Sequence, residues 1–144
     1  MAAITKYNKF VKNQNDGTAV IDWNTDTIKV ALVTNTYVPA PTTHDFFDDI
    51  TNEVSGTNYT AGGATLGSMT AVESAGTLTV DGADVTWTQS ASGFTTARFA
   101  IIYKSTGTAS TSPLFGYIDF GADKGNVAGS LILSWNAAGI FTVN

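Results

Sequence analysis

The side chains best suited to chemistry lie within residues 44–53. His44, the single histidine of the chain, is followed by Asp45. A histidine beside an aspartate is the pairing used in general acid–base and Ser-His-Asp catalysis, but no Gly-x-Ser-x-Gly elbow accompanies it here. We therefore interpret His44 as a residue that pairs locally at the start of a helix. A hydrolase, such as a depolymerase module, is the weaker hypothesis, and we predict that the chain is not an enzyme.

The carboxylates of the same segment raise the question of a metal site. They are Asp45, Asp48, Asp49 and Glu53. Calcium takes about six to eight oxygens from a loop that wraps the ion, whereas this spacing distributes the acids along one face of a helix. We interpret them as a solvated face, with a calcium contact at an assembly interface as the alternative. No metal site and no cofactor is predicted.

Two other patterns suggest ligands. Gly62-Gly63 lies among threonines but is not part of a Gly-Lys-Thr or Gly-x-Gly-x-x-Gly motif, so we exclude a nucleotide site. The three tryptophans have rings that could stack on sugars, but each lies in or beside an alternating strand, where a core position is the stronger interpretation. The tryptophans are Trp23, Trp87 and Trp135.

Two short helices are expected. Ile4, Tyr7, Phe10 and Val11 recur at helical spacing, which predicts an amphipathic N-terminal helix of about three turns within residues 1–15. The turn sequence of residues 15–17 (NDG) ends it. A second short helix is predicted over residues 45–50, starting from Thr42-x-x-Asp45. Its apolar face would hold Phe46, Phe47 and Ile50, with Asp45, Asp48 and Asp49 in water.

The rest of the chain consists of short strands and turns. Residues 28–33 and 99–103 are β-branched and apolar runs, and the second is typical of a strand buried on both faces. Further strands are predicted at 78–80, 85–87, 114–120, 131–135 and 140–143. The pattern favours a mainly β protein: an antiparallel β-sandwich or small barrel of about seven to eight strands. We expect one domain over residues 1–144, with an N-terminal helix or arm (1–15) and a body (18–144).

Composition limits the possible partners. Only 13% of the 144 residues are charged, there is no cysteine, and the net charge is −5. Lys6, Lys9 and Lys12 give the first twelve residues three cations and no acid, while the remainder carries four cations against twelve acids. Because phosphate backbones require clustered cations on the body of a domain, we predict no nucleic-acid binding. An apolar signal segment or membrane span is not recognised, so we expect synthesis in a host cytoplasm and no membrane partner.

Six segments carry a resemblance that covers nearly the whole chain. They are residues 22–32 (DWNTDTIKVAL), 44–50 (HDFFDDI), 51–66 (TNEVSGTNYTAGGATL), 84–87 (DVTW), 97–103 (ARFAIIY) and 114–123 (LFGYIDFGAD). In this order they resemble small β-rich structural proteins of tailed bacteriophages, of the head-decoration or cement type. The resemblance implies a bacteriophage virion structural protein without enzymatic activity, and it leaves the position of the chain on the particle open.

Within that class, the first expectation is a capsid decoration protein that binds the outer surface of the major capsid protein lattice and stabilises the head. A tail or baseplate protein involved in host attachment is the alternative. A homotrimer is expected, since three linked contacts would raise avidity at a three-fold site. The predicted contact elements are the basic N-terminal helix and the loops 51–67 and 105–112.

The candidate partner-binding residues lie in two of these elements. They are Lys6, Lys9 and Lys12, together with Asn58, Tyr59, Thr60, Gly62 and Gly63. An alternative for loop 51–67 is that its glycines and asparagines are required only by its turns.

Overall fold

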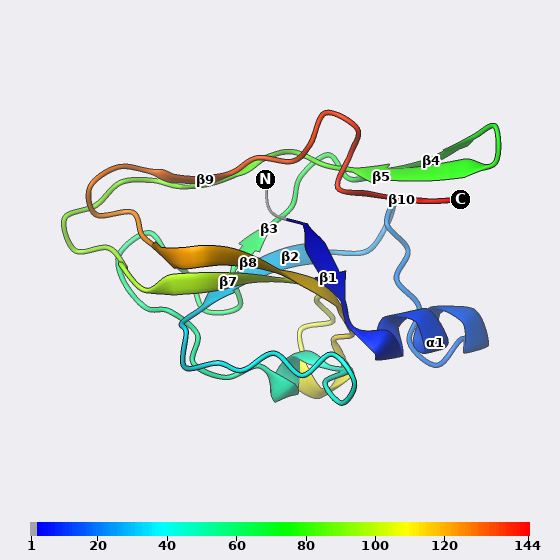
Figure 1. Cartoon of the computed structure of the whole chain (residues 1–144), viewed down its shortest axis with the longest axis horizontal. Coiled ribbons are helices and arrows are strands. Elements are labelled where there is room, and N and C mark those ends of the chain that lie inside the picture. Colours follow the sequence, from blue (N-terminus) through cyan, green and yellow to red (C-terminus); the bar gives the residue numbers. More distant parts are fainter. Residues whose placement is uncertain (1–2) are drawn as a thin grey trace.

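The computed structural model describes residues 3–144 and is mainly β, with antiparallel pairing throughout (Figure 1). The largest sheet has the order β1-β8-β7-β2-β3. Its strands are β1 (Ile4–Lys6), β2 (Ile28–Val33), β3 (Ala64–Thr65), β7 (Ala97–Lys104) and β8 (Leu114–Lys124). Two smaller sheets complete the fold, with the orders β10-β5-β4 and β6-β9. They contain β4 (Thr70–Ser74), β5 (Thr77–Asp81), β6 (Val85–Trp87), β9 (Leu131–Leu133) and β10 (Phe141–Val143).

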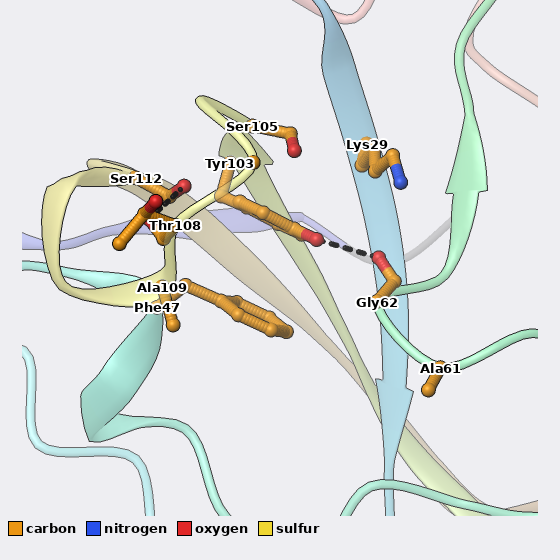
Figure 2. Close-up of a pocket in the computed structure, with 10 residues that line it drawn as sticks. Lys29, Phe47, Ala61, Gly62, Tyr103, Ser105, Thr108, Ala109 and Ser112 are labelled. Carbon is orange, nitrogen blue, oxygen red and sulfur yellow. Dashed lines mark hydrogen bonds between the residues drawn. The ribbon is translucent and has the colours of Figure 1, made fainter.

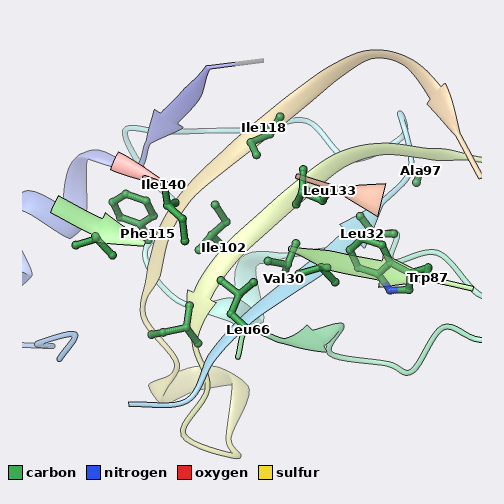
Figure 3. Packing of buried hydrophobic residues seen from close by; sticks show 14 of the residues in the cluster. Val30, Leu32, Leu66, Trp87, Ala97, Ile102, Phe115, Ile118, Leu133 and Ile140 are labelled. Carbon is green, nitrogen blue, oxygen red and sulfur yellow. The ribbon is translucent and has the colours of Figure 1, made fainter. Parts of the chain in front are cut away.

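The main core lies between the five-stranded sheet and the two smaller sheets (Figure 3). Val30, Leu32 and Ile102 point into it from the large sheet, and Trp87 and Leu133 close it from the other side. Alternate residues of β2 and β7 contribute to this core, as the period of two along a strand requires. The smaller sheets are thus held by apolar packing across the interior.

The opposite face of the large sheet has a second apolar cluster that includes Tyr7, Tyr37 and Ile101. Loops and two 3-10 turns, η1 (Phe47–Asp49) and η2 (Ala109–Thr111), cover it. Strand β7 is therefore buried on both faces, which confirms the prediction for residues 99–103.

The number of strands differs from the prediction, and so does the closure of the sheet into a barrel. Residues 3–144 contain ten strands rather than seven or eight. The three sheets in this part of the chain remain open, so the small barrel is not formed. The additional strands are β1, β3 and β4, and they form because β8, β2 and β5 offer free edges to them.

The N-terminal helix is shorter than predicted. Helix α1 spans Asn8–Asp16 and ends at Gly17 in a left-handed conformation, as the turn signal predicted. Ile4, however, belongs to a strand and pairs with Ile118 of β8. Tyr7 is fully buried, has an extended backbone, and donates its N–H to the Phe115 carbonyl at 3.0 Å. The apolar spacing of Ile4 and Tyr7 fits a helix, but pairing with β8 satisfies the same backbone groups.

The second predicted helix is wrong in extent, because only the turn η1 forms. The backbone of residues 45–47 bonds across to residues 112–114 instead. Leu114 donates its N–H to the Asp45 carbonyl at 2.9 Å, and Phe47 donates to the Ser112 carbonyl at 2.9 Å. Consequently the acids do not share a solvated helix face: Asp48 is exposed, whereas Asp45 and Asp49 are partly buried. Burial and the charge of Asp49 raise the pKa of Asp45.

The tryptophans lie largely where the strand pattern predicted. Trp23 and Trp87 are buried in the main core. Trp135 is partly buried and donates its ring N–H to the Ala83 carbonyl at 3.0 Å. No helix within residues 3–144 combines the length and apolar character needed to cross a membrane.

Asn126 joins three loops at the edge of the core. It is fully buried, accepts the Phe94 N–H at 2.9 Å, and donates to the carbonyls of Thr57 and Thr88 at 3.2 and 2.8 Å. We expect Asn126→Ala to lower the free energy of unfolding by about 3 kcal/mol, because buried partner groups lose their hydrogen bonds. The measurement is urea denaturation.

Asn24 provides the control for this substitution. Its side chain also makes two backbone hydrogen bonds, both to Ala71, but it is exposed. Since water replaces those bonds, Asn24→Ala should cost less than about 1 kcal/mol. Equal losses for the two variants would contradict the role given to Asn126.

Candidate functional site

Tyr59 anchors the loop 51–67. Its hydroxyl donates to Glu53 Oε1 at 2.5 Å and accepts the Leu32 N–H at 3.0 Å, and its ring packs edge-on against Phe94. Burial, followed by the hydrogen bond to Glu53, raises the pKa of Tyr59. The side chain is therefore turned toward the body of the protein rather than displayed.

Gly62 and Gly63 have the left-handed backbone that favours glycine, with φ of +89° and +83°. Gly62 donates its N–H to Glu53 Oε1 at 2.6 Å. A Cβ on Gly63 would overlap the backbone of Val30. The turn thus requires both glycines whatever the loop binds. Asn58 and Thr60 are exposed and remain the accessible members of the predicted set in this loop.

Two predicted contact loops, 51–67 and 105–112, converge on one pocket of about 250 Å³ (Figure 2). Strands β2 and β7 and the turn η1 supply the remaining wall. The lining residues are Lys29, Phe47, Ala61, Gly62, Tyr103, Ser105, Gly107, Thr108, Ala109 and Ser112. The large sheet brings the loops within reach of each other, because β2 pairs with both β3 and β7. Tyr103, which lies opposite Lys29 on β7, then reaches the Gly62 carbonyl with its hydroxyl.

Tyr103 organises the pocket. Phe47 stacks on its ring with centroids 4.0 Å apart and planes 12° apart. The Tyr103 hydroxyl donates to the Gly62 carbonyl at 2.6 Å and so ties strand β7 to the loop (Figure 2). Burial, with a contribution from the charge of Glu53, raises the pKa of Tyr103 to about 12. The pocket wall is consequently fixed by packing and hydrogen bonding before any ligand arrives.

His44 lies outside this pocket lining and bonds a tyrosine rather than a serine. Its Nδ1 and the Tyr37 hydroxyl are 2.8 Å apart, and Tyr37 shares a second hydrogen bond of 2.8 Å with buried Tyr7. These two hydrogen bonds link the segment before η1 to the start of α1. Within residues 3–144, the histidine and the carboxylates form no group of three that could hold a metal ion.

A second concave region lies beside helix α1. It is an apolar groove of about 360 Å³ between α1 and the strands β5 and β10. Its lining residues are Lys6, Phe10, Val11, Gln14, Asn15, Trp23, Leu78, Phe141 and Val143. Val11 is 53% exposed and Val143 45% exposed, while Trp23 lies in the floor with 6% exposed.

The three predicted lysines occupy different environments. Lys6 lies on β1 at the groove, with its Nζ 5.5 Å from the centre of the Phe141 ring. Lys9 is partly buried on α1. Lys12 forms an ion pair with Asp16 one turn along the helix, and this pairing lowers the pKa of Asp16. Of the three, only Lys6 lines the groove.

Three pocket residues lie outside the contact loops predicted from the sequence: Lys29, Phe47 and Tyr103. The sequence pattern could have identified Lys29, since it is the only charged residue in the apolar run of residues 28–33. It could not have identified Phe47 and Tyr103, because both were assigned to apolar faces and their stacking joins distant parts of the chain.

These features define a class: a mainly antiparallel β domain with a polar pocket built from two loops and an apolar groove beside its helix. Comparison with protein-family models, with curated proteins and with solved structures finds no match to this chain.

Proposed function

We propose that this chain is a non-enzymatic structural protein of a tailed-bacteriophage virion. In this proposal it is a capsid decoration protein that binds the major capsid protein on the outside of the head. The resemblance along six segments supports the class. The observation that carries a binding role is the apolar groove beside α1. We also propose that the body is a β-sandwich, because two layers of sheet enclose the main core.

The groove has the composition of a protein-binding surface. Phe10 and Phe141 provide aromatic walls above Trp23, and Val11 and Val143 are exposed beside them. Aromatic anchors in a concave apolar site contribute most to binding between proteins. Covering such surface gains about 25 cal/mol per Å² of apolar area removed from water.

Charge defines the partner segment more closely. Lys6 borders the groove, and the first twelve residues carry three cations without an acid. An apolar side chain flanked by Asp or Glu would complement this region in both shape and charge. We propose that the major capsid protein presents such a segment.

Decoration acts by mass action. Each copy that binds the assembled lattice and not the dissociated subunits stabilises the lattice by RT ln(1 + [L]/Kd). A homotrimer would link three such contacts and raise the apparent affinity without new chemistry.

The groove is tested with Val11→Asp. A carboxylate at this exposed helix position places an unpaired charge in the interface, and we expect at least a tenfold loss of binding to undecorated heads, measured by co-sedimentation. The control is Val72→Asp, on strand β4, where the side chain is 59% exposed and outside the groove lining. Both variants should melt close to the unmodified protein. If Val11→Asp binds as well as Val72→Asp, the groove is not the contact surface.

A further inference from the structure

We propose that the pocket between loops 51–67 and 105–112 is a carboxylate-binding site in which Lys29 supplies the positive charge. This inference concerns ligand chemistry and stands whether or not the chain decorates a capsid. The carboxylate can belong to a small free acid or to an Asp or Glu side chain of a partner protein.

Lys29 occupies an unusual position for an ammonium group. It lies on β2, where Ile28, Val30 and their neighbours up to Val33 have 0% exposure. The side chain is half-buried, lines the pocket, and has Tyr103 as its cross-strand neighbour. Holding a cation on such a strand costs desolvation energy unless an acceptor is supplied.

The other cations of β2 and β7 each have a carboxylate partner. Lys104 lies 2.8 Å from Asp26 Oδ2 and also donates to the Val20 carbonyl at 2.9 Å. Arg98 donates through Nε to Asp119 Oδ1 at 2.6 Å. Lys29, in contrast, makes no ion pair and no side-chain hydrogen bond with any group of residues 3–144 that the structure describes.

The pocket lining contains no acid that could neutralise Lys29. Glu53 is not part of the lining: its Oε1 accepts from the Tyr59 hydroxyl and the Gly62 N–H, and its carboxylate makes no ion pair with Lys29. The carboxylate that completes the site must therefore come from outside the pocket lining.

The remaining wall suits a small acid. Figure 2 shows the amine of Lys29, the hydroxyl of Ser105 and the ring of Phe47 around the phenol of Tyr103. Ser105 offers a hydroxyl to the second carboxylate oxygen, and the stacked rings offer an apolar surface to an aliphatic chain. One cation balances one negative charge, and about 250 Å³ accommodates a few heavy atoms.

The test is a titration of the ¹⁵N-labelled protein with acetate, followed by amide chemical shifts. We expect saturable shifts centred on Gly62 and Gly107, with a dissociation constant on the order of 1 mM. Acetamide, which has the same shape without charge, should give no saturable shift. Lys29→Met should abolish the acetate response, whereas Lys124→Met, which removes an exposed charge from β8, should preserve it.

Titrations with two kinds of ligand, a peptide and free acids, distinguish the two sources of the carboxylate. Tighter binding of a blocked Gly-Asp-Gly peptide than of acetate or propionate identifies a protein side chain, and the reverse order identifies a free acid. The spectrum of Lys29→Met reports whether the variant is folded, and Lys29→Gln serves as the second variant if it is not. An acetate response that is absent, is matched by acetamide, or persists without the Lys29 charge overturns the proposal.

Discussion

Gly63→Ala is expected to lower the free energy of unfolding by about 3–5 kcal/mol, combining the costs of a left-handed non-glycine residue and of overpacking. A Cβ at this position would lie 2.6 Å from the Ala31 Cα and closer still to the Val30 carbonyl. Both neighbours are backbone of β2, which pairs with β3 on one side and β7 on the other. Because β2 is held from both edges, it cannot move away to make room.

Gly17→Ala is the matched control for this prediction. Gly17 also has a left-handed backbone, with φ of +76°, but a Cβ there would meet no atom within 4 Å. Gly17→Ala should therefore lower the free energy of unfolding only by the cost of a left-handed alanine, about 1 kcal/mol. Urea denaturation of both variants separates the two contributions. If Gly63→Ala costs no more than Gly17→Ala, the close approach of the loop to β2 is wrong.

The second large effect is a loss of stability in alkali. The pKa values of Tyr7, Tyr37, Tyr59 and Tyr103 are all raised in the folded protein, chiefly by burial. Above pH 10 these tyrosines ionise in the unfolded chain but not in the folded one, so the unfolded state is favoured as pH rises. Each contributes a slope approaching about 1.4 kcal/mol per pH unit. The contribution of Tyr103 levels off near its folded pKa of about 12.

This prediction is checked by urea denaturation at a series of pH values between 8 and about 12, the range set by the tyrosine pKa. The contribution of these tyrosines to the free energy of unfolding should be constant below pH 10 and should fall at higher pH. Tyr7→Phe removes one of these four ionising groups and should make the fall shallower by about a quarter. It should also cost about 1 kcal/mol at neutral pH for the lost Tyr37 hydrogen bond. Phenolate absorbance rising fully near pH 10 in the folded protein would contradict the burial of these hydroxyls.

Strands with an unambiguous apolar pattern were predictable from the sequence. The runs that became β2 and β7 are long, β-branched and continuous, and only a strand covered on both faces accommodates them. The strand β1 was not predictable, because Ile4 and Tyr7 satisfy a helical spacing equally well. Pairing with β8, more than a hundred residues later, decided between the two.

The candidate site was predictable only in its loops. The sequence identified 51–67 and 105–112 as polar loops, but their meeting depends on the order of strands in the large sheet. Phe47 was predicted on the apolar face of a helix; that helix does not form, but Phe47 packs against the second apolar cluster, and its partner Tyr103 lies far along the chain. Local patterns give the burial of a side chain more readily than they give the residue it contacts.

The most direct test of the central proposal is cryo-electron microscopy of the virion that contains this chain. We predict regular copies on the outer shell of the head, each contacting two or more capsid subunits, with the groove beside α1 at the contact. Density for the chain confined to the tail or baseplate would contradict the decoration role and favour host attachment instead.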